Sequence, residues 1–281
     1  MPVFCRSQGS PCFFSDARKK RKKKEMSRFL IILLCLIIIA FLLAVLSYGS
    51  ERFSRVDRDH VILQTSDGRS EYHDMVGLLR PIQEEYARRH GWSYLYATGI
   101  LYGTWPNHSI FNRYFLIRRL LKDHPAVRWI LYMDADSYFV DLDKDWKTEL
   151  DPAFLVIACA GSAETQEPWD FNNGVFFFHA RHPLAKKFLR DYLKELHGRY
   201  PLAFLRSNRS WVCDQEIMQD MFRKEEYAPH LKTYQGDRHN YFNYEGPHIR
   251  QMLRSKNSNE ERLEKARKIL EESGLKPRPL R

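Results

Sequence analysis

Cysteine is scarce in this sequence, and the residues present show no paired spacing. The five are Cys5, Cys12, Cys35, Cys159 and Cys213. A structural zinc site needs closely spaced Cys or His pairs, and a disulfide-stabilised domain needs a dense set of cysteines, so the pattern argues against both classes. If the body of the chain lies in an oxidising compartment, Cys159 and Cys213 form its only possible intrachain disulfide. Two buried free thiols are the equal alternative.

An excess of positive charge is missing from the middle of the chain. The net charge of the 281 residues is +10, but residues 1–28 carry +7 and residues 251–281 carry +4, which leaves −1 for residues 29–250. A domain that binds nucleic acid needs a basic patch on its body. The sequence therefore predicts no nucleic-acid partner. No internal repeat is visible either.

One long hydrophobic run is present. The 20 residues from 29 to 48 carry no charged side chain. Seven consecutive basic residues precede them, at positions 18–24. A helix of this length spans about 30 Å, the thickness of a bilayer core. A convincing small-residue cleavage site is lacking, and the basic flank favours a cytosolic amino terminus. The pattern predicts a single-pass signal anchor in the Golgi or ER membrane, with a lumenal body.

These shifts in composition predict five segments. They are a cytosolic basic tail over residues 1–28, the anchor over 29–48, a short stem over 49–59, a catalytic domain over 60–250, and a basic helix and tail over 251–281. The helix expected over residues 259–272 is amphipathic and charged, which is typical of a solvated or peripheral element. Two sequons, at Asn107 and Asn208, would lie on the lumenal side, where N-glycans are added.

An apolar run ending in two carboxylates stands out in the body. Residues 129–133 read Trp-Ile-Leu-Tyr-Met, and Asp134 and Asp136 follow. Such a run predicts a strand buried on both faces, whose carboxyl end is where open α/β sheets bind ligands. If the backbone stays extended, both carboxylates point to one side and need a cation between them, for which Mg²⁺ or Mn²⁺ with phosphate oxygens is suited. The alternative is an ordinary strand-to-turn junction.

Two further segments could meet a nucleotide. A strand over residues 61–63 runs into a loop with Thr65 and Asp67, and the loop after the first strand of an α/β protein commonly contacts base or ribose. A helix expected over residues 111–122 places Arg113 near its start, where it could reach a pyrophosphate. The alternatives are a plain strand–turn and a solvated helix face.

Two later segments offer groups that suit a sugar. Asn172, Asn173 and Gly174 lead into an apolar strand; the carboxamides donate and accept hydrogen bonds, and the glycine permits close backbone approach. Asp214 and Gln215 begin a short helix, where they would flank a bound sugar. The alternative for that pair is helix capping and complementarity to the helix dipole.

The order of these motifs resembles a known family. Thr-Ser-Asp at 65–67, Leu-Tyr-Met-Asp-Ala-Asp at 131–136, Asn-Asn-Gly-Val-Phe at 172–176, Asp-Gln-Glu at 214–216 and a late histidine follow one another. Over residues 60–250 the chain is similar to the GT-A nucleotide-sugar glycosyltransferases, and most similar to glycosyltransferase family 34, which includes fungal α-galactosyl and mannosyl transferases and plant xyloglucan xylosyltransferases. The resemblance implies an α/β, Rossmann-like GT-A fold.

The resemblance also implies a metal cofactor. The family holds Mn²⁺, or Mg²⁺, with the two aspartates of its Asp-x-Asp motif and a carboxy-terminal histidine, which would be Asp134, Asp136 and His248 here. The metal bridges the nucleotide diphosphate and offsets charge on the leaving group. Because the sequence around His248 departs from the family's pattern, His239 is a rival ligand.

For the sugar, the resemblance implies that Asp214 or Gln215 stabilises the reacting centre, and that Asn172 and Asn173 hold the donor. The expected activity is transfer of a hexose or pentose from a nucleotide-diphosphate sugar to a glycan, glycoprotein or glycolipid acceptor, with retention of configuration. Two alternatives use the same residues differently. One is an inactive, membrane-anchored relative that binds sugar or nucleotide, and the other is a metal-dependent hydrolase or nucleotidyltransferase.

Overall fold

The computed structural model describes residues 26, 29–38, 56, 58–200, 213–254 and 258–276. The chain divides into two compact units, Met1–Ser50 and Glu51–Arg281. In the first, residues 29–38 are helical. Among the described residues, no helix combines the length and apolar character needed to cross a membrane. The rest of the expected anchor, the basic run at 18–24 and the sequon at Asn208 lie outside the described residues.

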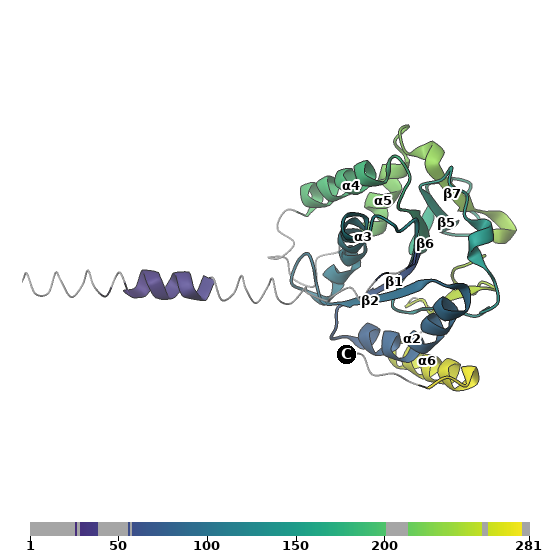
Figure 1. Ribbon diagram of the computed structural model, residues 1–281, viewed down its shortest axis with the longest axis horizontal. Coiled ribbons are helices and arrows are strands. Elements are labelled where there is room, and N and C mark those ends of the chain that lie inside the picture. Colours follow the sequence, from purple (N-terminus) through teal and green to yellow (C-terminus); the bar gives the residue numbers. More distant parts are fainter. Residues whose placement is uncertain are drawn as a thin grey trace, which may run out of the picture. The chain divides into compact units, whose positions relative to one another are not determined.

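The second unit is built around one six-stranded sheet (Figure 1). Its strands, in spatial order, are β2 (Ser93–Thr98), β1 (His60–Ser66), β3 (Trp129–Met133), β6 (Phe171–His179), β5 (Val156–Ala160) and β7 (Leu231–Tyr234). Strand β1 is parallel to β2 and β3, and β5 is parallel to β7, whereas β6 runs antiparallel to both its neighbours. The strands expected from the apolar runs are confirmed, within a mixed sheet.

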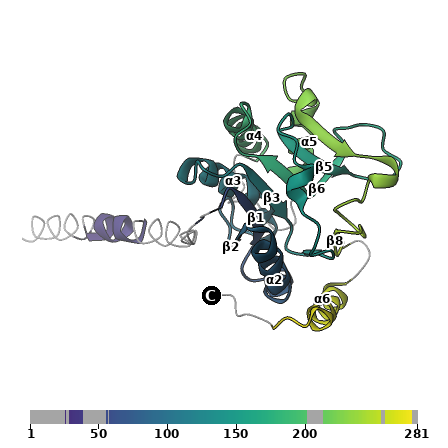
Figure 2. The ribbon, with the colours of Figure 1, turned by 45° about the vertical axis from the view of Figure 1, so that its right-hand side comes forward.

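Helices cover both faces of this sheet (Figures 1 and 2). One face packs on α3 (Asn112–Asp123), α4 (Ala185–Arg199) and α5 (Asp214–Phe222), and the other on α2 (Glu71–His90) and α6 (Asn259–Ser273). Side chains of strand β3 pack on both faces of the sheet. Ile130 and Tyr132 point to the first face, and Leu131 and Met133 point to the second. This alternation explains why the run had to be apolar at every position.

Helix α6 is fixed at its start by a capping box. Ser258 Oγ accepts from the Glu261 amide at 3.2 Å, and Glu261 accepts from the Ser258 amide at 2.7 Å. The helix expected over residues 259–272 is therefore confirmed, but its expected peripheral character is wrong. It packs along α2, and Arg262 and Ala266 are fully buried.

A small second sheet completes the unit. Strand β4 (Ser137–Phe139) pairs antiparallel with β8 (Ile249–Gln251), and Ser137 lies opposite Gln251. This pairing brings a late part of the chain to the turn that follows β3. The short 3₁₀ helices are η1 (Pro106–Phe111), η2 (Trp146–Glu149), η4 (Ala228–His230) and η5 (Gly236–Arg238).

The cysteines of the second unit are free thiols. Cys159 is buried in β5, and Cys213 precedes α5. Burial raises the pKa of the Cys159 thiol to about 12, so the group stays protonated and behaves as a small apolar side chain. Of the two alternatives for this pair, the free thiols are the ones present.

Candidate active site

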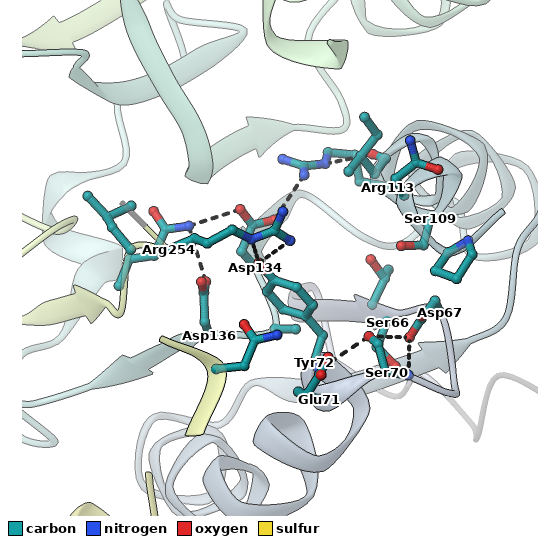
Figure 3. A pocket seen from close by; sticks show the side chains of 18 of the residues that line it. Ser66, Asp67, Ser70, Glu71, Tyr72, Ser109, Arg113, Asp134, Asp136 and Arg254 are labelled. Atoms are coloured by element: carbon teal, nitrogen blue, oxygen red, sulfur yellow. Dashed lines mark hydrogen bonds and ion pairs between the residues drawn. The ribbon is translucent and has the colours of Figure 1, made fainter. Parts of the chain in front are cut away.

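A cavity of about 630 Å³ opens where β1 and β3 end (Figure 3). The loop after β1, the start of α2, the η1 turn, the segment after β3 and the residues from β8 to α6 all contribute to its lining. Its lining includes Thr65, Asp67, Tyr72, Arg113, Tyr132, Asp134, Asp136, Gln251 and Arg254. The carboxyl ends of parallel strands thus form the site, as expected for an α/β fold.

A tight turn, not an extended strand, presents the two aspartates. The Ser137 amide donates to the Asp134 carbonyl at 3.0 Å, and the Asp134 amide donates to the Gly174 carbonyl of β6 at 2.7 Å. The condition of an extended backbone is therefore not met, and the backbone here is a strand-to-turn junction. Both carboxylates still face one group, the side-chain amide of Gln251.

Each carboxylate has one oxygen anchored by the protein and the other turned to Gln251. Asp134 Oδ1 accepts from Arg113 Nη2 and from the Tyr132 hydroxyl, both at 2.9 Å. Asp136 Oδ2 accepts from Arg262 Nη1 at 3.1 Å. The remaining oxygens, Asp134 Oδ2 and Asp136 Oδ1, lie 3.0 and 3.1 Å from Gln251 Nε2.

Repulsion within the pair is visible in the acidity of Asp136. Burial, followed by the negative charge of Asp134, raises the pKa of Asp136 to about 7, against the opposing effect of Arg262. The Asp136 side chain is only 5% exposed, whereas that of Asp134 is 25% exposed at the cavity. A bound cation would relieve this repulsion, so the electrostatics of the pair fit a metal site.

Arg113 is a buried structural cation rather than an open phosphate contact. Its Nε donates to the Ile110 carbonyl at 3.1 Å, and its other nitrogens are taken by Asp134 and by the Asn173 carbonyl. Burial lowers the pKa of Arg113, but Asp134 and then Asp214 raise it by more, so the group stays charged. The expected reach to a pyrophosphate is not available in this arrangement. Arg254, which is exposed at the cavity and donates to the Tyr72 hydroxyl at 2.8 Å, is better placed.

Asp214 and Asn173 form a buried layer beneath Arg113. Asn173 Nδ2 donates to Asp214 Oδ2 at 2.8 Å, and Asp214 Oδ2 also lies 3.3 Å from Arg113 Nε. Asp214 is 6% exposed and is not part of the cavity lining. Gln215, half-buried at the same helix start, accepts from the Asn173 amide at 3.2 Å. The structure thus brings three of the predicted sugar-site residues together, Asn173, Asp214 and Gln215, one layer behind the aspartates.

The predicted nucleotide contacts both line the cavity. Asp67 Oδ1 caps the turn into α2 by accepting from Ser70 Oγ at 2.8 Å. Its Oδ2 is buried and has no hydrogen-bond partner among the described residues. Thr65 Oγ1 lies 3.3 Å from the Tyr132 hydroxyl. Asp67 Oδ2 is the acceptor that a ligand hydroxyl could satisfy.

Asn172 faces away from this cluster. Its Oδ1 accepts from Asn243 Nδ2 at 3.0 Å and from the Gly174 amide at 2.6 Å, and its Nδ2 donates to the Tyr244 hydroxyl at 3.2 Å. These contacts tie the start of β6 to the loop before β8. Of the two adjacent asparagines, Asn173 is therefore the one joined to Asp214, through its side-chain amide, and to Arg113, through its backbone carbonyl.

Gly174 makes room for the amide of Gln251. A Cβ atom at this position would lie 2.6 Å from Gln251 Oε1 and 2.7 Å from Gln251 Nε2. We expect Gly174→Ala to push the amide off the aspartates and to lower the free energy of unfolding by about 1–3 kcal/mol. Urea unfolding followed by tryptophan fluorescence measures the change.

The control for that variant is Gly198→Ala in α4. A Cβ atom there meets nothing within 4 Å, so alanine should stabilise the helix by about 0.5–1 kcal/mol. Equal stability of the Gly174→Ala and Gly198→Ala variants would show that the space at Gly174 is not needed.

The expected third metal ligand is not brought to the aspartates. His248 Nδ1 lies 2.8 Å from Asp141 Oδ2, and its ring packs edge-on against Trp146 and Tyr241. The rival, His239, is half-buried in the loop after η5, with Nδ1 2.9 Å from the Gly236 carbonyl. Neither lines the cavity. In the described parts of the chain, no three His, Cys, Asp or Glu side chains converge to hold a metal ion.

Two residues of the site, Gln251 and Arg262, were not predicted from the sequence. Gln251 has no recognisable motif, and only the β4–β8 pairing places it. Arg262 carried a usable signal, because it shares the spacing of Ala266 and Leu270, at positions i, i+4 and i+8. Residues at that spacing lie on one face of a helix, and Ala266 and Leu270 are buried.

Comparisons with known proteins agree with this architecture. Residues 57–191 match the galactosyl transferase GMA12/MNN10 family, which is glycosyltransferase family 34. Over 96 residues the chain is 28% identical to galactomannan galactosyltransferase 1 of Cyamopsis tetragonoloba. That alignment covers 32% of this chain and 22% of the relative, so the match spans about a fifth of the relative's length. The family resemblance seen in the motifs is confirmed.

A solved structure shows the same fold. A glycosyltransferase involved in the glycosylation of the major capsid of PBCV-1 superposes with a TM-score of 0.53 at 17% identity, over 74% of this chain and 98% of that one. The glycosyltransferase GlyE of Streptococcus pneumoniae TIGR4 gives a TM-score of 0.45 at 16% identity, over 79% of this chain and 66% of that one. The first likeness establishes a GT-A-like α/β fold.

Proposed function

We propose that this chain transfers a hexose from a nucleotide-diphosphate sugar to a glycan acceptor, because residues 57–191 match glycosyltransferase family 34. Galactose is the first sugar to test, since the family and the matched relative are both described as galactosyl transferases. The observation that carries the proposal is the placement of Asp134 and Asp136 on the wall of the cavity at the ends of β1 and β3.

The aspartate pair fits a divalent cation, Mn²⁺ or Mg²⁺. Asp134 and Asp136 each keep one oxygen held by the protein, and each directs the other toward a common point. Anchoring of the outer oxygen orients the inner one, as partners behind metal ligands do. When bound, such a cation supplies electrostatic stabilisation of the diphosphate leaving group. The role of the pair is therefore to hold charge rather than to move protons.

The rest of the donor is assigned by position. Asp67, with its unpartnered Oδ2, and Thr65 lie where base or ribose would enter. Arg254 is the exposed cation of the cavity lining that suits a phosphate oxygen. The donor sugar would then lie toward β6 and the start of α5. There, the backbone amide of Asn173 donates to the side chain of Gln215 and positions it. The side-chain amide of Asn173 in turn donates to Asp214.

Gln215 is the better candidate for contact with the reacting sugar. Its side chain is half-buried, whereas Asp214 is buried and its Oδ2 is held by Arg113 and Asn173. Asp214 is thus a positioning residue in this proposal. We further propose that configuration is retained, which proton NMR of the newly formed glycosidic linkage would report.

The setting proposed for this reaction is the Golgi or ER lumen, with residues 29–48 as the membrane anchor. The acceptor would be a glycan on a glycoprotein or glycolipid. Protease protection of the full chain in sealed microsomes tests the topology. Protection of the body supports a lumenal site, and digestion of the body from the cytosolic side contradicts it.

A donor screen tests the activity itself. The full chain in detergent is incubated with each of the common nucleotide sugars, a mixture of oligosaccharide acceptors and Mn²⁺, and nucleotide release and product mass are measured. The expected result is one donor, UDP-galactose first, that yields a product heavier by one hexose. Release of the nucleotide with only free sugar would indicate a hydrolase, and no turnover with any donor would contradict the enzyme assignment.

A further inference from the structure

We propose that Gln251, and not a histidine, is the third protein ligand of the cation that Asp134 and Asp136 hold. This inference rests on the proposed function, and it replaces the expected Asp–Asp–His set with three oxygen donors. The ligand atom would be the side-chain amide oxygen of Gln251. The proposal starts from the contacts of that amide, which bridges the two carboxylates.

The spacing of these atoms, that of ordinary hydrogen bonds, is also compatible with a coordination sphere. Gln251 Nε2 lies 3.0 Å from Asp134 Oδ2 and 3.1 Å from Asp136 Oδ1. When a cation binds six oxygens octahedrally at about 2.1 Å, neighbouring oxygens lie about 3.0 Å apart. An amide oxygen at the position of Nε2 would therefore have the separation from each carboxylate oxygen that two adjacent ligands of one cation have.

A half-turn of the amide supplies that oxygen. Rotation about the Cγ–Cδ bond exchanges the nitrogen and oxygen of a glutamine with almost no change in shape, so their assignment follows from the partners present. With no cation, Nε2 faces the two carboxylates as a donor, and Oε1 is buried without a hydrogen-bond partner in the described chain. With a cation, the same site favours the oxygen, which is otherwise unsatisfied.

The surroundings hold both aspartates and Gln251 in place for this role. Arg113 and Tyr132 fix the outer oxygen of Asp134, and Arg262 fixes that of Asp136. Gln251 is fixed by the pairing of β8 with β4 and enters the space left by Gly174. Two ring contacts and Asp141 hold His248 elsewhere. Carboxylate and carbonyl oxygens suit Mg²⁺ and Mn²⁺, whereas an imidazole ligand favours Zn²⁺ and other later metals.

Metal binding alone tests the assignment. The full chain in detergent is titrated with Mn²⁺, and the free ion is measured by electron paramagnetic resonance. We expect Gln251→Met to weaken Mn²⁺ binding at least about 10-fold, because it removes the oxygen and keeps a similar volume. Gln251→Glu, which restores an oxygen and adds a charge, should bind Mn²⁺ at least as tightly as the wild type. Gln251→His should raise the ratio of Zn²⁺ to Mg²⁺ affinity.

Two controls bracket the result. His248→Ala and Gln219→Met should leave Mn²⁺ affinity within about 2-fold of the wild type, because His248 faces Asp141 and Gln219 bonds to Asp170 and Phe171. Wild-type affinity in Gln251→Met, or loss of affinity in His248→Ala, overturns the proposal.

Failure of the ligand assignment can be distinguished from failure of the proposed function. If Asp136→Asn weakens Mn²⁺ binding while Gln251→Met does not, only the ligand assignment is wrong. If the wild type does not bind Mn²⁺ and the donor screen is also blank, the proposed function and this inference are overturned together.

Discussion

Asp136→Asn is expected to lower kcat/KM for sugar transfer by about 10²- to 10³-fold. The substitution keeps the shape of the side chain but removes one of the two charges that would hold the cation against the diphosphate. A loss of this size corresponds to about 3–4 kcal/mol of transition-state stabilisation. Initial rates with the donor found in the screen, at saturating acceptor, measure it.

The matched control is Asp143→Asn. The Asp143 side chain is 90% exposed and pairs with Arg89 on the surface, where an ion pair contributes little. Its rate should stay within about 2-fold of the wild type. If Asp136→Asn transferred sugar as fast as Asp143→Asn, the aspartate pair would not be the site of the chemistry.

Arg262→Met is expected to lower the free energy of unfolding by about 3–5 kcal/mol. The Arg262 side chain is 0% exposed, and Asp136, its ion-pair partner at 3.1 Å, is 5% exposed. Removing the guanidinium leaves the buried Asp136 carboxylate without its ion-pair partner. The loss of folding free energy is then far larger than the net contribution of the intact pair. Arg262→Lys keeps the charge but not the planar guanidinium. Its free energy of unfolding should therefore lie between those of the wild type and Arg262→Met. Urea unfolding of the full chain gives the values.

Arg267→Met on the same helix is the control. Arg267 is 54% exposed and pairs with Glu264, which is 77% exposed. Such a pair contributes between about 0 and 1 kcal/mol. An Arg262→Met variant as stable as Arg267→Met would mean that α6 docks on α2 without help from Asp136.

Most of the strands could be predicted from the sequence, because each corresponds to a short local run of apolar residues. The run at 129–133 is apolar at every position, since residues on both sides of β3 are buried. Strand directions could not be predicted, because they depend on how distant segments pair. The antiparallel course of β6 beside β3 is one example.

The aspartates could be found in the sequence, whereas their surroundings could not. Only Ala135 separates Asp134 from Asp136 in the chain, and this spacing alone suggests that the two carboxylates act together. Gln251 and Arg262 reach the same pair across separations of 115 and 126 residues. No local pattern encodes a contact of that kind.

The position of the histidine could not be predicted from the motif. The resemblance assigned His248 to the metal, but the sequence does not reveal that Asp141 lies close enough to engage its ring. The three-residue offset between His248 and Gln251 decides which side chain reaches the aspartates. That offset follows from the register of β8 on β4.

The proposed site is tested most directly by a crystal structure of the protein with Mn²⁺ and UDP, with the ion located by its anomalous signal. We expect one Mn²⁺ within about 2.2 Å of oxygens from Asp134, Asp136 and Gln251. We also expect the diphosphate on that ion, with the uridine toward Asp67. An ion bound by His248, or a nucleotide bound outside the cavity at the ends of β1 and β3, would contradict the proposed site.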